Sequence, residues 1–182
     1  QIESIFNKLK FFKSNYKKIV LDKNNRVFLA TATVLILFLS YFIIPTLYDK
    51  EIIKSQIKNQ VLKKYEIKIK FNNEITYGLI PAPHYSSKDL SIMRNEKLIG
   101  TAKNFKVFIS ISDFIKINKI LTKDLIFKNT DFNIQKEDYI FFENLLKTEP
   151  NDNKIFIKNS NIFFKDKNNE VLFINKIANS QF

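Results

Sequence analysis

An uninterrupted apolar run over residues 27–44 constrains this chain more than any other feature. It contains no charge, proline, glycine, asparagine or glutamine. As an α-helix the run would be about 27 Å long at ~1.5 Å per residue, close to the roughly 30 Å hydrocarbon core of a bilayer. A buried core helix is the alternative, but helices that cover a core usually keep a polar face, and this run has none. With Tyr41 near its end and Pro45 just after it, the run predicts one transmembrane helix over residues 27–45.

The charges on either side of this run predict its orientation. Residues 1–26 hold seven lysines and arginines against Glu3 and Asp22, whereas the residues just after the run mix both signs. Because basic flanks stay in the cytoplasm, we expect a cytoplasmic N-terminus and a translocated remainder. A cleaved signal peptide is the alternative. It fits less well, because its apolar region would be about 7–15 residues long and small residues should follow it.

Residues 1–26 also carry apolar side chains at helical spacing, with lysines on the other side. This basic amphipathic segment suits an interfacial helix that lies on anionic headgroups. A basic tail that only sets the topology is the alternative, and the sequence does not choose between them.

The composition argues against most catalytic sites. There is no cysteine, one histidine (His84) and two glycines, so Cys-based sites, His-rich metal sites and Gly-rich phosphate loops are disfavoured. We expect His84 at the surface. The acidic residues Asp113 and Asp131 suit turns, and Glu137 with Asp138 suits the start of a helix. The sequence therefore predicts no enzyme, no cofactor and no metal site.

The net charge of +12 does not by itself indicate a nucleic-acid partner. Of the 30 basic residues, only Arg26 and Arg94 are arginine, the residue that reads phosphate and bases bidentately. Lysine, isoleucine and asparagine, which are abundant here, have A/T-rich codons, so coding bias accounts for much of the charge. We expect no nucleic-acid partner and assign the lysines to the solvated face of a sheet.

Residues 49–64 predict an amphipathic helix. Asp49 is placed to cap it, and Glu51 in the first turn and the lysines in the last turn suit the helix dipole. Its apolar stripe comprises Ile52, Ile53, Ile57, Val61 and Leu62.

Beyond this helix the apolar period changes from 3.6 to 2, which is typical of strands with one apolar face. We expect seven strands, over residues 66–71, 75–80, 88–93, 104–111, 125–134, 155–164 and 171–174. Turn-forming residues separate them, and short helical inserts are expected at 114–117 and 139–146.

Two of these strands form an internal repeat with an offset of 30 residues. Residues 125–134 read LIFKNTDFNI, and residues 155–164 read IFIKNSNIFF. In both copies the apolar phase shifts at the same place, which requires a bulge or tight turn at Asn129-Thr130 and Asn159-Ser160. Chance similarity in a biased composition is the alternative.

The expected helices are too short to cover so many one-faced strands. Two sheets could cover each other as a sandwich. Alternatively, one curved sheet could leave an apolar groove for another occupant, and acyl chains would bury there as side chains do. Periodicity leaves both open.

The ordered motifs of residues 44–138 resemble the N-terminal region of the AsmA-like family. They are IPTLYDK at 44–50, IKI at 67–69, LIPAP at 79–83, KDLSI at 88–92, TAKNFKVFIS at 101–110 and IFKNTD at 126–131. The family usually has glycine near the end of its first periplasmic helix and in the next strand. Here residues 64–66 and 70–72 contain none.

The resemblance implies a fold, a location and a function. The fold would be a membrane-anchored α+β protein, with one transmembrane helix, an amphipathic helix and a mostly antiparallel curved β-sheet forming an apolar groove. Residues 46–182 would be its periplasmic domain, truncated at the C-terminal end, on the inner membrane of a Gram-negative bacterium. Its partners would be phospholipid, the membrane and other envelope proteins. Its role would be to pass phospholipid during outer-membrane biogenesis.

The residues expected to line the groove are apolar strand positions, namely Ile67, Ile69, Phe71, Phe105, Val107, Ile109, Phe127 and Ile157. An anchored scaffold with a closed β core and no lipid cargo is the alternative function.

Overall fold

The computed structural model describes residues 23–140, 143 and 154–181. The chain forms two compact units, Gln1–Ile43 and Ile44–Phe182. Most of the amphipathic segment predicted at 1–26 lies outside the described residues, as does most of the helical insert predicted at 139–146.

The first unit contains the predicted apolar helix, α2, which runs from Lys23 to Ile43. A short 3-10 helix, η1 (Ile44–Leu47), follows directly and belongs to the second unit. The stretch Asn25–Leu47 is long and apolar enough to cross a membrane, with a mean hydropathy of 2.5. Regular α-helix therefore ends at Ile43, one residue before the end of the predicted run, because Pro45 cannot continue it.

Helix α3 (Lys50–Tyr65) is capped as predicted. The carboxylate of Asp49 accepts hydrogen bonds from the amides of Glu51 and Ile52 at 2.8 and 3.1 Å. The apolar stripe is narrower than expected. Ile53, Ile57 and Val61 are buried, whereas Ile52 and Leu62 at its margins are exposed.

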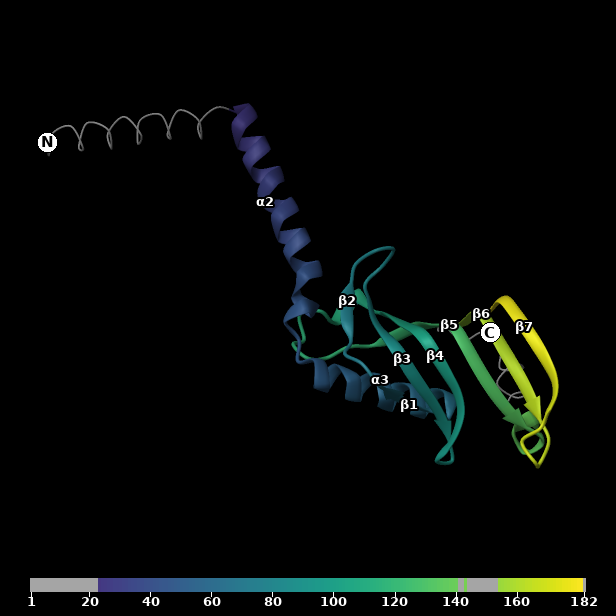
Figure 1. Cartoon of the computed structure of the whole chain (residues 1–182). Coiled ribbons are helices and arrows are strands. Elements are labelled where there is room, and N and C mark those ends of the chain that lie inside the picture. Colours follow the sequence, from purple (N-terminus) through teal and green to yellow (C-terminus); the bar gives the residue numbers. More distant parts are fainter. Residues whose placement is uncertain (1–22, 141–142, 144–153, 182) are drawn as a thin grey trace, which may run out of the picture. The chain divides into compact units, whose positions relative to one another are not determined.

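The described residues contain all seven predicted strands, and they form a single open sheet. They are β1 (Lys68–Phe71), β2 (Thr76–Gly78), β3 (His84–Arg94), β4 (Lys97–Ile109), β5 (Thr122–Gln135), β6 (Ile155–Lys165) and β7 (Val171–Gln181). The order is β1-β3-β4-β5-β6-β7, and β2 also pairs with β3 (Figure 1). Every pair is antiparallel except β5 and β6, which are parallel. The mostly antiparallel sheet is confirmed, and the parallel pair is a feature that periodicity did not predict.

The predicted repeat is this parallel pair. Strands β5 and β6 align with the same offset of 30 residues, from Leu125 beside Ile155 to Gln135 beside Lys165. Asn129 and Asn159 have φ of 53° and 48°, so both predicted phase shifts are left-handed bulge residues. The Ser160 hydroxyl also accepts a hydrogen bond from the Thr130 amide at 3.1 Å.

The irregular positions lie side by side across the sheet. Asp89 in β3 has φ 52°, and the pairing of β4 with its neighbours on either side omits Lys103. These two positions continue the row formed by Asn129 and Asn159. Bulges bend strands and increase their twist, and Figure 1 shows β4 curving along its length.

Helix α3 covers one end of the strand order. It contacts β1, and two of its glutamines bond to residues 118–122, at the start of β5. The helix therefore crosses the face of β3 and β4, which lie between these two attachment points. Two short 3-10 helices, η2 (Ile111–Asp113) and η3 (Lys136–Asp138), complete the described elements. The insert predicted at 114–117 lies at η2 instead, because the Ser110 hydroxyl caps the chain there.

Candidate functional site

The predicted groove residues come together, but as packed core. Seven of the eight are at most 8% exposed, and Phe71 is half-buried. The strand register places Phe105, Phe127 and Ile157 in one row across β4, β5 and β6. The rings of Phe105 and Phe127 are 5.2 Å apart, and that of Phe71 lies 6.0 Å from Phe105. These side chains therefore pack against one another and do not line an empty channel.

The same apolar face becomes accessible toward β7. Ile134, Phe164 and Phe173 form another row across β5, β6 and β7. Ile134 is 1% exposed, Phe164 is half-buried and Phe173 is 54% exposed. The rings of Phe164 and Phe173 stack at 4.1 Å, and Tyr139 packs edge-on against Phe164. The exposure of the side chains in this row thus increases from β5 to β7.

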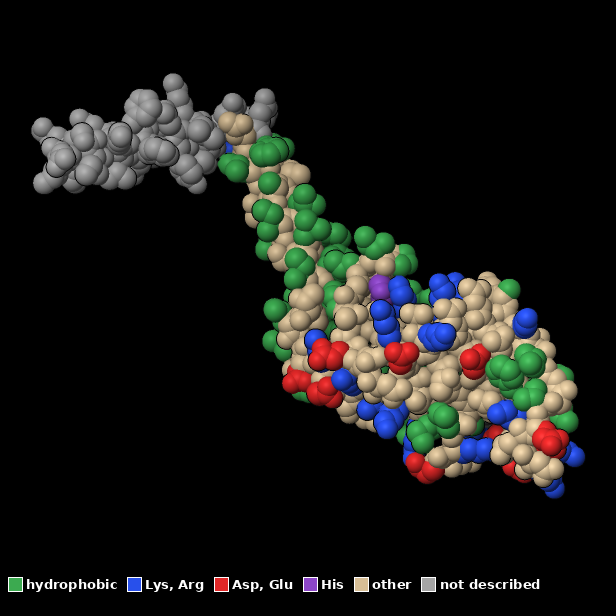
Figure 2. Space-filling model, viewed as in Figure 1, with side chains coloured by type: hydrophobic (Ala, Val, Ile, Leu, Met, Phe, Trp, Pro, Cys, Tyr) green, Lys and Arg blue, Asp and Glu red, His purple; other side chains and the backbone are tan. Residues whose placement is uncertain are grey.

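The other face is apolar at this place too, since Phe163 pairs with Ile174 beside that row. We call these side chains the β7 patch, made of Phe163, Phe164, Val171, Leu172, Phe173 and Ile174. Figure 2 shows hydrophobic side chains gathered over this part of the sheet. Strand β7 is also the last in the strand order, so one of its edges pairs with none of the described strands.

Sequence reasoning identified residues 171–174 as a strand but not as a site. Four consecutive apolar residues without alternation indicate a strand that is covered on both faces. Within the described part of the chain, these four residues are instead 48–61% exposed. The missing alternation was the signal that could have identified the β7 patch.

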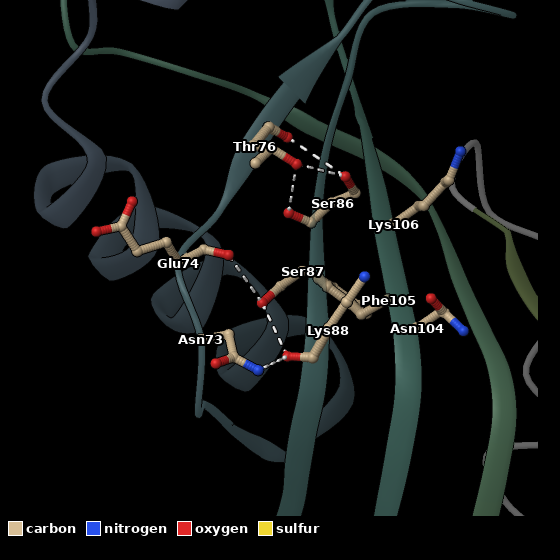
Figure 3. Close-up of a pocket in the computed structure, with 9 residues that line it drawn as sticks. All are labelled: Asn73, Glu74, Thr76, Ser86, Ser87, Lys88, Asn104, Phe105 and Lys106. Atoms are coloured by element: carbon tan, nitrogen blue, oxygen red, sulfur yellow. Dashed lines mark hydrogen bonds between the residues drawn. The ribbon is translucent and has the colours of Figure 1, made fainter.

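A pocket lined mainly by polar residue types lies between the β1–β2 connection and strands β3 and β4 (Figure 3). Its volume is about 540 Å³, and its lining includes Lys88, Lys106 and Asn104. Its hydroxyls bond to nearby groups, for example Thr76 to Ser86 at 2.9 Å. Glu74 turns toward α3 and pairs with Lys50 at 2.8 Å, and this hydrogen bond and charge hold the pKa of Glu74 below its usual range. The pocket therefore presents hydroxyl, amide and ammonium groups.

The other singled-out acids have structural partners. Asp131 accepts a hydrogen bond from the Asn161 amide at 2.8 Å. Asp138 is buried and pairs with Arg94 at 3.3 Å and Lys97 at 3.6 Å. Asp113 ends η2. Among the described residues, no group of three acidic or histidine side chains is arranged to hold a metal ion.

The prediction that His84 lies at the surface is wrong. Its side chain is buried, its ring packs 5.6 Å from that of Phe108, and its Nδ1 lies 2.8 Å from the Ala82 carbonyl oxygen. The ring also lies over Gly78, where a Cβ atom would come within 2.8 Å of it. The proline-rich turn before β3 suggested exposure, but the β2–β3 hairpin folds His84 inward.

Comparison with known proteins finds no protein-family model that matches the chain, and no matching protein among the curated ones. A function for this chain therefore has to be argued from its residues and their geometry.

Proposed function

We propose that this chain is a membrane-anchored protein of AsmA-like type that handles phospholipid on an apolar face of its β-sheet. Its location would be the inner membrane of a Gram-negative bacterium, with the sheet in the periplasm and a role in outer-membrane biogenesis. The observation that carries the proposal is the β7 patch, where, among the described residues, the core face of the sheet continues through Phe164 and Phe173 with increasing exposure.

The composition of α2 supports the anchor. None of its most apolar 18-residue window is buried within the protein. Its hydroxyl residues Thr31, Thr33 and Ser40 donate to the carbonyl four residues earlier, at 2.8–2.9 Å. These bonds satisfy the hydroxyls within the helix, as hydrocarbon surroundings require.

The β7 patch is the better place for an acyl chain than the predicted groove. An acyl chain under α3 would have to displace packed side chains such as Phe105 and Val107. On the patch it would cover surface that already faces water, at about 25 cal/mol per Å² removed from water. The stacked rings of Phe164 and Phe173 provide a flat apolar surface for such a contact.

Photocrosslinking in the full chain tests this proposal. Benzoylphenylalanine would replace Phe173 in the patch, and in a second variant Leu98 on β4. Leu98 is a matched control, because it is apolar and 49% exposed but lies away from β7 in the strand order. The chains would be irradiated in intact bacterial membranes, and the adducts identified by mass spectrometry.

We expect phospholipid adducts at position 173 and none at 98. Equal yields at both positions would contradict a specific lipid surface. In a separate measurement without a crosslinker, a Phe173→Asp variant should co-purify with less phospholipid while keeping its fold, because the side chain is already half exposed. Phe127→Asp could not make this distinction, since it would place a carboxylate in the core.

An anchored scaffold without lipid cargo is the second candidate. It is favoured by the closed packing of the predicted groove residues and by the edge of β7 that pairs with none of the described strands, since such an edge can add a strand from another protein. In the same experiment, protein adducts without lipid adducts at position 173 would favour the scaffold.

A further inference from the structure

A second group of exposed apolar side chains lies at the other end of the strands. Its members are Leu47, Leu79, Ile80, Ile115, Ile117 and Leu121, which are between 41% and 87% exposed. We call this group the apolar rim. Large side chains are seldom left in water on loops in such number without a surface that covers them.

The rim is built from three chain segments, which hydrogen bonds hold together. The Tyr85 hydroxyl donates to the Pro45 carbonyl at 2.9 Å, and the Tyr48 hydroxyl donates to that of Phe114 at 2.5 Å. The Ile109 amide donates to the Pro83 carbonyl at 3.1 Å. These bonds join η1, the β2–β3 loop and the connection from β4 to β5 into one platform. Figure 2 shows hydrophobic side chains gathered on the loops beside the histidine.

The residue types in the rim suit a membrane boundary. The β2–β3 loop at 79–83 reads LIPAP and carries no charge. In the other loop, the exposed Lys116 and Lys119 alternate with the apolar residues. Lysines can lay their apolar stems along hydrocarbon while the ammonium stays among headgroups.

The covalent chain joins this platform directly to α2. Ile43 ends α2, and the next residue already belongs to η1, which contributes Leu47 to the rim. Pro45 and Tyr48 on either side are buried in the second unit. No linker therefore separates the apolar helix from the rim, and a bilayer that contains α2 is within the rim's reach.

We infer that the apolar rim inserts into the headgroup and upper acyl region of the bilayer that α2 crosses. This contact seats the second unit on the membrane surface. The inference rests on the anchoring part of the proposed function and not on lipid handling. It assigns the rim to the bilayer, and it leaves the β7 patch, at the far end of the strands, away from it.

Single cysteines make this testable, because the chain has none of its own. Four full-length variants would carry a fluorophore at Val34→Cys in α2, Ile80→Cys and Ile117→Cys in the rim, and Leu98→Cys. Leu98 is the matched control, because it lies eleven residue steps along β4 from Ile109 at the rim end, about 36 Å at ~3.3 Å per residue. The variants would be reconstituted in phosphatidylethanolamine–phosphatidylglycerol vesicles with a nitroxide-labelled lipid as quencher. Circular dichroism would confirm the fold.

We expect the quencher to suppress the emission of the labels at 34, 80 and 117 but not at 98. Quenching at 34, with 80 and 117 as bright as 98, would overturn the rim contact and leave the anchor and lipid handling intact. Equal quenching at 80, 117 and 98 would also overturn it, because the contact would not be confined to the rim. An unquenched label at 34 would overturn the anchor and the rim contact together.

Discussion

At the scale of single residues, asparagine does in this chain much of what glycine does in others. Positive φ occurs at eight non-glycine residues of the described part, five of which are asparagine. Neither glycine has positive φ, and both instead allow close approach of a ring, His84 at Gly78 and Phe132 at Gly100. Asparagine tolerates the left-handed region better than most residues, so a chain with two glycines can still bulge and turn.

At the C-terminus of α3 too, a residue other than glycine adopts the left-handed conformation. Glu66 follows the helix with φ 56°, and its amide bonds to the Leu62 carbonyl at 3.0 Å. This left-handed cap is usually glycine. The glycine that the AsmA-like pattern leads one to expect near this point is thus absent, while the conformation that glycine favours is present.

The bulge asparagines should therefore be sensitive to substitution in a particular order. Asn129→Ala should lower the free energy of unfolding by about 1 kcal/mol, because a Cβ without a compensating amide is strained at φ 53°. Asn129→Gly should cost less. Urea unfolding of the detergent-solubilised chain measures both. Lys128→Ala, at an exposed neighbour without positive φ, is the control, and an equal loss there would contradict the role of the left-handed backbone.

At the scale of elements, the apolar pattern was enough to locate every strand, although β7 neither alternates over residues 171–174 nor has a buried face. The ends of the strands were predicted less accurately. Strand β4 begins at Lys97 rather than 104, and β7 continues to Gln181 rather than 174. Pattern cannot say which strands are neighbours, so the repeat was visible while the parallel pairing of β5 and β6 was not.

The position of α3 over the sheet could not be predicted either. The apolar stripe of α3 shows that it needs a partner, but not which strands it crosses. That choice depends on polar contacts between residues far apart in sequence. Gln60 and Gln56 bond with the backbone of residues 118–122, in a connection that has no regular pattern of its own. The core positions were therefore recognised as apolar, but their burial under α3 was not.

These glutamines should fasten α3 over the sheet. The Gln60 side chain accepts from the Thr122 amide at 2.8 Å and donates to the Ile120 carbonyl at 2.9 Å. Gln60→Leu removes both of these hydrogen bonds from partly buried backbone groups, so we expect a loss of about 2–3 kcal/mol at roughly 1–3 kcal/mol per group. Hydrogen exchange at the Thr122 amide should also accelerate.

Asn59→Leu is the control for that substitution, because Asn59 lies on the same helix and is exposed. If Gln60→Leu were no more destabilising than Asn59→Leu, packing of the apolar stripe alone would hold the helix.

At the scale of the whole molecule, the second unit has an apolar group at each end of its strands and a closed core between them. The rim lies where β3 and β5 begin, and the β7 patch lies where β5 and β6 end. A lipid that reached the patch from the bilayer would have to pass along the β5–β7 side, because α3 occupies the face of β3 and β4. The two crosslinking and quenching experiments therefore examine separate ends of one sheet.

The tyrosines of the second unit should make the fold sensitive to alkali. Burial, with a smaller contribution from the neighbouring Tyr48, raises the pKa of Tyr77 from 10.0 to about 12, and burial also raises the pKa of Tyr85. A raised pKa means that the folded chain holds these protons at a pH where the unfolded chain has released them. The stabilisation is therefore complete below pH 10 and is lost as the pH rises toward 12.

The Tyr77→Phe variant lacks one such group, so the midpoint of its alkaline unfolding, followed by circular dichroism, should move to higher pH. Lysine deprotonation is common to both chains, and any difference in stability at pH 8 would be subtracted. An unchanged or lower midpoint would mean that Tyr77 does not contribute to alkaline unfolding.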